Sequence, residues 1–153
     1  MTRQGVACLI TDPARTAAIL QRKDAGYPVP RFRHALACFG GQREPGEAPD
    51  SAIRREITEE VADLPLRAAV LARIRPSGAV TTSFGHHVHC YIAVLPDFAR
   101  HAARITVLPQ QLICTEGEME VHALRGLDAV PFAWDAGLLV RTCLAFPADR
   151  DTA

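Results

Sequence analysis

The segment from Leu36 to Glu60 constrains the fold more than any other part of the sequence, because it joins a strand, a glycine pair and an acidic helix at short spacing. Leu36–Phe39 is an apolar run that predicts a strand, which we expect Gly40 and Gly41 to end. Glycine lets the backbone approach a ligand closely. The sequence therefore predicts a strand, a binding loop and a helix in succession.

The helix is expected to begin near Pro49, which fits a first helical turn because its missing N–H is not needed there. Ile53, Ile57 and Val61 recur every four residues and predict one buried stripe. We expect residues 63–65 to end the element.

Three carboxylates lie beside that stripe. Glu56, Glu59 and Glu60 stand at positions i, i+3 and i+4, which groups them on one surface of the helix. Like charges at this spacing repel by about 0.2–0.5 kcal/mol per pair, and we expect Arg55 to reach only Glu59. An oxygen-only cluster suits Mg²⁺ or Mn²⁺. A solvated acidic helix face is the alternative that these residues alone leave open.

The segment resembles the Nudix box, G-x5-E-x7-R-E-U-x-E-E-x-G-U, in which U is an aliphatic residue. Gly41 and Glu47 take the first two specified positions, and Arg55–Glu60 supplies the next block. Ala62 and Asp63 stand in place of the closing glycine and aliphatic residue. We interpret this departure as a helix end shifted by one residue, with Asp63 tolerating the left-handed turn that glycine normally supports.

The resemblance implies an α/β fold, an α/β/α sandwich with a mixed β-sheet, formed by one domain over residues 1–153. It implies hydrolysis of the diphosphate bond in a nucleoside diphosphate linked to a further group, with Mg²⁺ or Mn²⁺ as cofactor. The candidate substrates are nucleoside triphosphates, oxidised nucleotides, nucleotide sugars, ADP-ribose and dinucleoside polyphosphates.

The resemblance also implies roles for individual residues. Arg55 should orient the carboxylates, and Glu47 should brace the loop or assist the metal site. The general base is a box glutamate or a later one, and Glu116 is favoured because the adjacent Gly117 indicates a turn. The expected metal ligands are Glu56, Glu59, Glu60 and the Gly40 carbonyl. The expected catalytic residues are Glu56, Glu59, Arg55, Glu47 and Glu116. The expected substrate contacts are Gly41, Arg22, Arg33 and Phe39.

The rest of the chain gives weaker predictions. Short apolar or alternating runs predict strands at 6–10, 17–21, 66–74, 88–95 and 118–124. Residues 126–130 could form a short helix, and 133–144 carries a helical pattern. The basic loop at 22–34 is either solvated or contacts substrate. Tyr27, Phe32 and Phe84 could stack on a base, whereas Trp134 is expected to pack in the core.

Composition excludes several classes of protein. Lys+Arg and Asp+Glu both number 17, so the net charge is zero and the footprint of a duplex nucleic-acid binder is missing. No apolar run approaches the ~20 residues that span a bilayer. Five cysteines without a C-x-x-C pair, and a first segment without a signal-peptide pattern, favour reduced thiols and a cytoplasmic location. The sequence leaves open whether the chain forms a homodimer.

The sequence leaves two other functions open. A Nudix module could bind a nucleotide as a sensor without turning it over, but such a module would be expected to lack the carboxylates. An isomerase acting on an isoprenoid diphosphate would need a catalytic cysteine, and Cys38 lies in an apolar run. His86, His87 and His89 invite a zinc site, but only His87 and His89 share a strand face.

Overall fold

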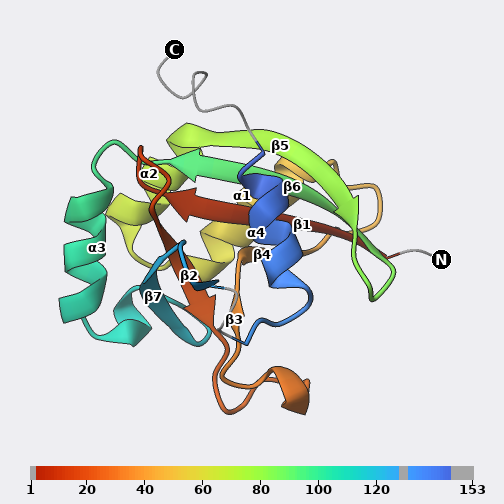
Figure 1. Ribbon diagram of the computed structural model, residues 1–153, viewed down its shortest axis with the longest axis horizontal. Helices are drawn as coiled ribbons and strands as arrows, with labels where there is room; N and C mark the ends of the chain where they lie inside the picture. The colour runs from red at the N-terminus through yellow and green to blue at the C-terminus, as the bar shows by residue number, and fades with distance from the viewer. Residues whose placement is uncertain (1–2, 128–130, 146–153) are drawn as a thin grey trace.

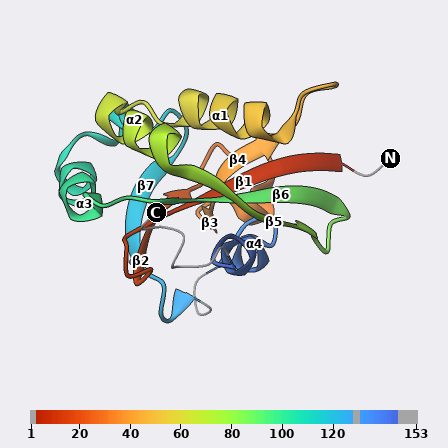
Figure 2. The same ribbon diagram turned by 90° about the horizontal axis from the view of Figure 1, so that it is seen from above.

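A computed structural model describes residues 3–127 and 131–145 of the chain. A twisted sheet lies between two layers of helices, with α1 and α2 on one face and α4 on the other (Figure 2). α3 lies at one end of the sheet (Figure 1). The expected α/β/α sandwich with a mixed β-sheet is confirmed.

In the part of the chain that the structure describes, the sheet has seven strands in the order β3-β2-β1-β6-β5, with β4 paired to β1 and β7 paired to β2. The strands are β1 (Arg3–Thr11), β2 (Ala17–Arg22), β3 (Leu36–Ala37), β4 (Phe39–Gln42), β5 (Ile74–Thr81), β6 (His86–Val94) and β7 (Glu118–Ala123). The pairing of β1 with β6 is parallel, whereas the other pairings are antiparallel.

The helices are α1 (Pro49–Glu60), α2 (Leu64–Arg73), α3 (Phe98–Val107) and α4 (Ala136–Cys143), with short 3₁₀ turns at η1 (Pro30–Phe32) and η2 (Gln110–Leu112). Because successive strand residues face opposite sides, β1 serves two cores. Val6 and Ile10 pack towards α1 and α2, whereas Ala7 and Leu9 pack towards α4. Both faces of β1 are therefore apolar.

α1 confirms the predicted helix and its start, but it ends at Glu60, before the predicted end at residues 63–65. Pro49 occupies its first turn, and the buried residues include Ile53 and Ile57. We predicted that the glycine pair would end the preceding strand, but this prediction is wrong. β4 continues through Gly40 and Gly41, which pair with Ala7 and Val6 of β1. The ladder continues because β1 offers its backbone along this whole stretch.

The expected strand at 66–74 is wrong. Residues 64–73 form α2, and Leu66 and Val70 are its buried residues, one helical turn apart. Asp63 caps this helix by accepting a hydrogen bond from the Leu66 N–H at 3.1 Å. The proposed left-handed turn at Asp63 is also wrong, because its φ is −67°. Asp63 begins the next helix instead of ending α1, and it pairs with Arg104 at 2.7 Å.

Most of the other predicted elements are present. The strands at 6–10, 17–21, 88–95 and 118–124 and the late helix at 133–144 are confirmed, with shifted ends. α3 had no counterpart among the predicted elements. Residues 128–130 of the suggested short helix lie outside the described residues. All five cysteines are buried and free, as expected.

Candidate active site

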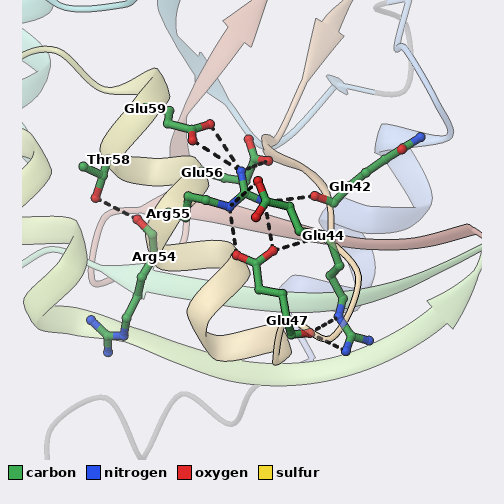
Figure 3. Close-up of polar contacts among 9 residues, drawn as sticks. Gln42, Glu44, Glu47, Arg54, Arg55, Glu56, Thr58 and Glu59 are labelled. Atoms are coloured by element: carbon green, nitrogen blue, oxygen red, sulfur yellow. Dashed lines mark hydrogen bonds and ion pairs between the residues drawn. The ribbon is translucent and has the colours of Figure 1, made fainter.

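The loop between β4 and α1 folds around the guanidinium of Arg55 (Figure 3). Arg55 Nε lies 2.8 Å from Glu47 Oε1, and its Nη1 lies 2.9 Å from Glu56 Oε1 and 3.3 Å from Glu59 Oε2. The sequence had predicted a pairing with Glu59 alone. That prediction was too narrow, because the loop carries Glu47 back over the helix to the same cation.

Glu47 also braces its own loop. Its Oε2 accepts a hydrogen bond from the Glu44 N–H at 2.8 Å, and its carbonyl accepts two from Arg43 at 2.9 and 2.6 Å. The Arg55 hydrogen bond, followed by that of the Glu44 N–H, lowers the pKa of Glu47 to about 2. Glu47 is therefore ionised at neutral pH, and it fixes Arg55 in place.

The glycine pair brings the β4 backbone against the helix carboxylates. A Cβ on Gly41 would lie 2.6 Å from Glu56 Oε1. Gly40 has a φ of +146°, and a Cβ there would lie 2.0 Å from the Val6 carbonyl oxygen. Gly40 therefore requires glycine because of the backbone of the neighbouring strand, whereas a side chain at Gly41 would displace the Glu56 carboxylate.

Glu60 lies at the inner edge of this cluster. Its Oε1 accepts a hydrogen bond from the Gly40 N–H at 3.3 Å. Its Oε2 is buried and has no hydrogen-bond partner among the described residues. Burial raises the pKa of Glu60 well above its ordinary value; the charge of Lys23 opposes this shift and the Glu56 carboxylate adds to it.

The carboxylates fit a hard divalent cation in their chemistry, because an orphaned buried oxygen of Glu60 lies beside the carboxylate of Glu56. Within residues 3–127 and 131–145, however, no three His, Cys, Asp or Glu side chains converge as a ready metal site. The Glu59 side chain is 58% exposed and pairs with Arg55 at 3.3 Å.

The loop after η2 is fastened to the end of α1. Thr115 Oγ1 donates to the Glu59 carbonyl at 2.6 Å, and the Thr115 N–H donates to the Glu60 carbonyl at 3.0 Å. Glu116 follows and is exposed. The turn expected at Gly117 is present, with a φ of +69° and no room for a Cβ against the Arg22 carbonyl oxygen.

A cavity of about 230 Å³ adjoins the glycine pair. Gly40 and Gly41 line it on one side, and Lys23, Tyr27 and Trp134 are among its other lining residues. The backbone of β4 thus borders both the carboxylate cluster and the cavity. The sequence predicted Gly41 as a substrate contact and left the basic loop that carries Lys23 as either solvated or in contact with substrate. It assigned Trp134 to packing and did not predict that Trp134 lines the cavity.

Lys23 and Arg3 are cationic residues that line the cavity. Lys23 lies beside Tyr27. Its Nζ donates to Gln21 Oε1 at 2.9 Å and lies 4.9 Å from the centre of the Tyr27 ring. The predicted substrate residues of this loop lie elsewhere. Arg22 makes a two-point ion pair with Glu120, and Arg33 donates to the Tyr27 carbonyl at 2.9 Å. Neither arginine lines the cavity.

Phe39 was also predicted to contact substrate. It borders the cavity, but it is 0% exposed and its side chain belongs to the core beneath α1. A contact between its ring and a substrate stays a prediction, because the ring is buried in that core.

Trp134 is both a packing residue and a cavity wall. Its ring lies 4.6 Å from that of Phe32 and 5.3 Å from that of Phe84, between ring centres. Its Nε1 donates to the Tyr27 hydroxyl at 2.7 Å. These side chains come from distant parts of the sequence, so composition and periodicity could not bring them together.

The model of the NUDIX domain family matches residues 1–130 of this chain. No curated protein sequence matches it at a significant level. None of the helices in the described part of the chain is long and apolar enough to cross a membrane.

Solved structures share the fold at low identity. The NUDIX domain of Shewanella oneidensis NrtR, complexed with ADP ribose, is 16% identical with a TM-score of 0.63, covering 94% of this chain and 87% of that one. A mutT/nudix family protein from Listeria innocua is 15% identical with a TM-score of 0.63, covering 94% and 92%. A bifunctional NMN adenylyltransferase/ADP ribose pyrophosphatase from Francisella tularensis is 13% identical with a TM-score of 0.65, covering 94% and 41%.

Proposed function

Because this chain belongs to the Nudix domain family, we propose that it hydrolyses the diphosphate bond of a nucleoside diphosphate linked to a further group, with Mg²⁺ or Mn²⁺ as cofactor. One observation carries the proposal. The glycine pair of β4 touches the Glu56 and Glu60 carboxylates and also lines the cavity. A substrate in that cavity would have its phosphates beside the carboxylates.

The proposed roles follow from the contacts. Glu56, Glu59 and Glu60, with the Gly40 carbonyl, would hold the metal. The bound ion would neutralise phosphate charge and activate a water for attack on phosphorus. Arg55 orients two of these carboxylates and is itself fixed by Glu47. Glu116, exposed on the loop tied to the end of α1, is the proposed general base.

The cavity favours a small nucleotide as substrate. Its volume of about 230 Å³ is below the range of ~300–1,000 Å³ that is usual for drug-sized ligands. We infer that it accommodates one base. An indole wall suits the flat face of a base, since stacking gives about 1–3 kcal/mol per base. Lys23 offers a positive charge to a phosphate.

The test is turnover across a panel of nucleoside triphosphates, oxidised nucleotides, ADP-ribose, nucleotide sugars and dinucleoside polyphosphates, with and without Mg²⁺. Coupled pyrophosphatase and phosphatase convert either product to phosphate. The expected result is metal-dependent hydrolysis of a mononucleotide, lost in Glu56→Gln. Lys23→Gln should raise KM and leave kcat nearly unchanged. Equal turnover without divalent metal would contradict the proposal.

A second function is a binding module that holds a nucleotide without cleaving it. One observation favours it: Arg55 already occupies Glu47, Glu56 and Glu59, and no three metal-ligating side chains converge in the described residues. The similar Shewanella oneidensis domain is described in a complex with ADP ribose. Tight ADP-ribose binding with no turnover in Mg²⁺ or Mn²⁺ would establish this second function in place of the first.

A further inference from the structure

Two consecutive residues at the start of α4 adopt a backbone conformation that they rarely take. Trp134 has a φ of 54° and Asp135 a φ of 59°, both in the left-handed region. For a bulky residue such as tryptophan this region is a true outlier, whereas aspartate tolerates it better. Strained residues of this kind persist only where their surroundings hold them, and they cluster at functional sites.

Asp135 shows what holds this pair. It stands at the N-cap position of α4, where aspartate normally accepts a hydrogen bond from its own helix. Here the side chain makes no such cap. Its Oδ2 accepts instead from the N–H of Ser83 at 2.7 Å and from the Ser83 hydroxyl at 2.6 Å. The carboxylate has been diverted from its helix to a distant turn.

Ser83 lies in the tight turn between β5 and β6. Thr82 closes this turn, because its carbonyl accepts from the Gly85 N–H at 2.9 Å and its hydroxyl accepts from the His86 N–H at 3.3 Å. The two hydrogen bonds of Asp135 therefore anchor the start of α4 to a part of the molecule with its own rigid hydrogen bonding.

The residue placed by this anchor is Trp134. Its indole N–H reaches Tyr27 at 2.7 Å, and its ring lies against those of Phe84 and His86, at 5.3 and 5.6 Å between centres. Phe84 and His86 flank the turn that Asp135 grips. The hydrogen bonds of Asp135 and the ring contacts with Phe84 and His86 thus both hold Trp134 beside this turn, and Trp134 also lines the cavity.

We propose that Asp135 is a positioning residue, whose carboxylate clamps the turn at Ser83 and so presents Trp134 as a preformed wall for the flat ring of the substrate. The effect of this clamp on turnover rests on the proposed function. The substrate class that the Trp134 wall would favour is a nucleotide whose base stacks on Trp134. Asp135 acts through Trp134 and does not touch the phosphates, since the carboxylate cluster lies across β4 on α1.

The clamp predicts a graded series of variants. Asp135→Asn keeps an oxygen that can accept both hydrogen bonds, Ser83→Ala removes one of them, and Asp135→Ala removes both. Trp134 is the only tryptophan in the sequence. Its near-ultraviolet circular dichroism and acrylamide quenching therefore report how rigidly the Trp134 ring is held and how exposed it is. These two signals need neither substrate nor metal.

Full-length protein carrying each change would be compared with wild type. Asp135→Ala should raise the quenching constant of Trp134 about twofold and the KM for the best nucleotide about tenfold, with kcat within twofold, as expected when binding shared by ground and transition states is lost. Asp135→Asn should match wild type, and Ser83→Ala should fall between. Melting temperature and far-ultraviolet circular dichroism check folding, and Ser83→Ala carries the test if Asp135→Ala does not fold.

The results separate this inference from the proposed function. Unchanged Trp134 signals in both Asp135→Ala and Ser83→Ala would overturn the clamp. A loss in Asp135→Asn equal to that in Asp135→Ala would also overturn it, because the charge and not the hydrogen bonds would then matter. A fall in kcat at constant KM would overturn the positioning role. A wild-type protein that cleaves no nucleotide, with the graded Trp134 signals intact, would refute hydrolysis and leave the clamp standing.

Discussion

Replacing Gly41 by alanine tests whether the position of the Glu56 carboxylate is set by the bare backbone of β4. The new Cβ would lie 2.6 Å from Glu56 Oε1, 2.8 Å from its Cδ and 2.9 Å from its Oε2. Real Cβ contacts are essentially never under 3.0 Å, so the carboxylate must retreat by at least 3.0 − 2.6 = 0.4 Å. The hydrogen bond of 2.9 Å between Arg55 Nη1 and Glu56 Oε1 would then be stretched or lost.

The expected change in the free energy of unfolding of Gly41→Ala is the sum of two opposing effects. Loss of a charge-assisted hydrogen bond is worth about 1.5–3 kcal/mol, and we reduce this to about 1.5–2 kcal/mol because the Arg55 side chain is 25% exposed. Gly→Ala at an ordinary φ stabilises by about 0.4–1 kcal/mol through the unfolded state. The net destabilisation should be about 1 kcal/mol, which corresponds to a fall in Tm of about 2–4 °C for a chain of this size.

The two effects can be separated in a Glu56→Ala background. There the clash is gone, so Gly41→Ala should become stabilising, and the sign of its effect on Tm should reverse. Gly26→Ala, where the nearest atom is 3.4 Å away, is the matched control for the unfolded-state effect. Chemical unfolding of the four variants of the cycle gives the coupling energy directly.

Activity provides the second measurement. Displacement of a catalytic group by about 1 Å costs ~10²-fold, so a shift of 0.4 Å or slightly more should lower kcat about tenfold in Gly41→Ala. If Gly41→Ala changes Tm equally in both backgrounds and leaves kcat unaltered, the contact between β4 and Glu56 does not control the site, and the reasoning fails.

Three further predictions concern residues around the site and the core. Glu59→Gln should lower kcat about 100-fold, with Tm changed by less than about 2 °C because an exposed ion pair is worth under ~1 kcal/mol; wild-type turnover would remove Glu59 from the proposed metal ligands. The Arg22 hydrogen bond, and then that of His122, lowers the pKa of Glu120. The stability of that pair is therefore present above the unfolded pKa of about 4.3 and is lost as pH falls through the lowered folded pKa. Glu120→Gln should cost about 0.5–1 kcal/mol at pH 7, and this cost should shrink as the pH is lowered into the acid range; a deficit independent of pH would refute the assignment. Leu66 is 0% exposed, so Leu66→Ala should lower the free energy of unfolding by about 2–5 kcal/mol. Leu64 is 66% exposed, so Leu64→Ala should change it by under ~0.5 kcal/mol. Equal effects in chemical unfolding would contradict the helical register of α2.

The sequence predicted local structure well where two signals agreed. α1 combines a proline in its first turn with isoleucines one turn apart, and its predicted start is correct, although it ends before residues 63–65. The run that forms α2 was assigned to a strand, because a short apolar segment cannot be assigned from periodicity alone. Asp63 is a favourable N-cap residue for α2. The resemblance to the Nudix box instead led us to interpret Asp63 as part of the end of α1.

The site was predictable only in part, for a physical reason. The carboxylates of α1 and the glycines of β4 are close in sequence, so their proximity follows from local structure. The cavity is different, because Lys23 and Trp134 meet only after β2 and α4 have packed on the sheet. The Arg55 contact with Glu47 depends on how the loop turns at Gly46, whose φ is +77°.

The parallel pairing of β1 with β6 has a consequence for synthesis on the ribosome. Arg3 pairs with His86, and Thr11 with Val94, so each partner of β1 on that side follows 83 residues later. At a translation rate of ~5–20 residues per second, the apolar first strand waits about 4–17 s for this neighbour. In that interval its exposed edge can pair with other nascent chains. Slower translation before His86 should therefore lower the soluble yield of this protein more than slower translation after Val94.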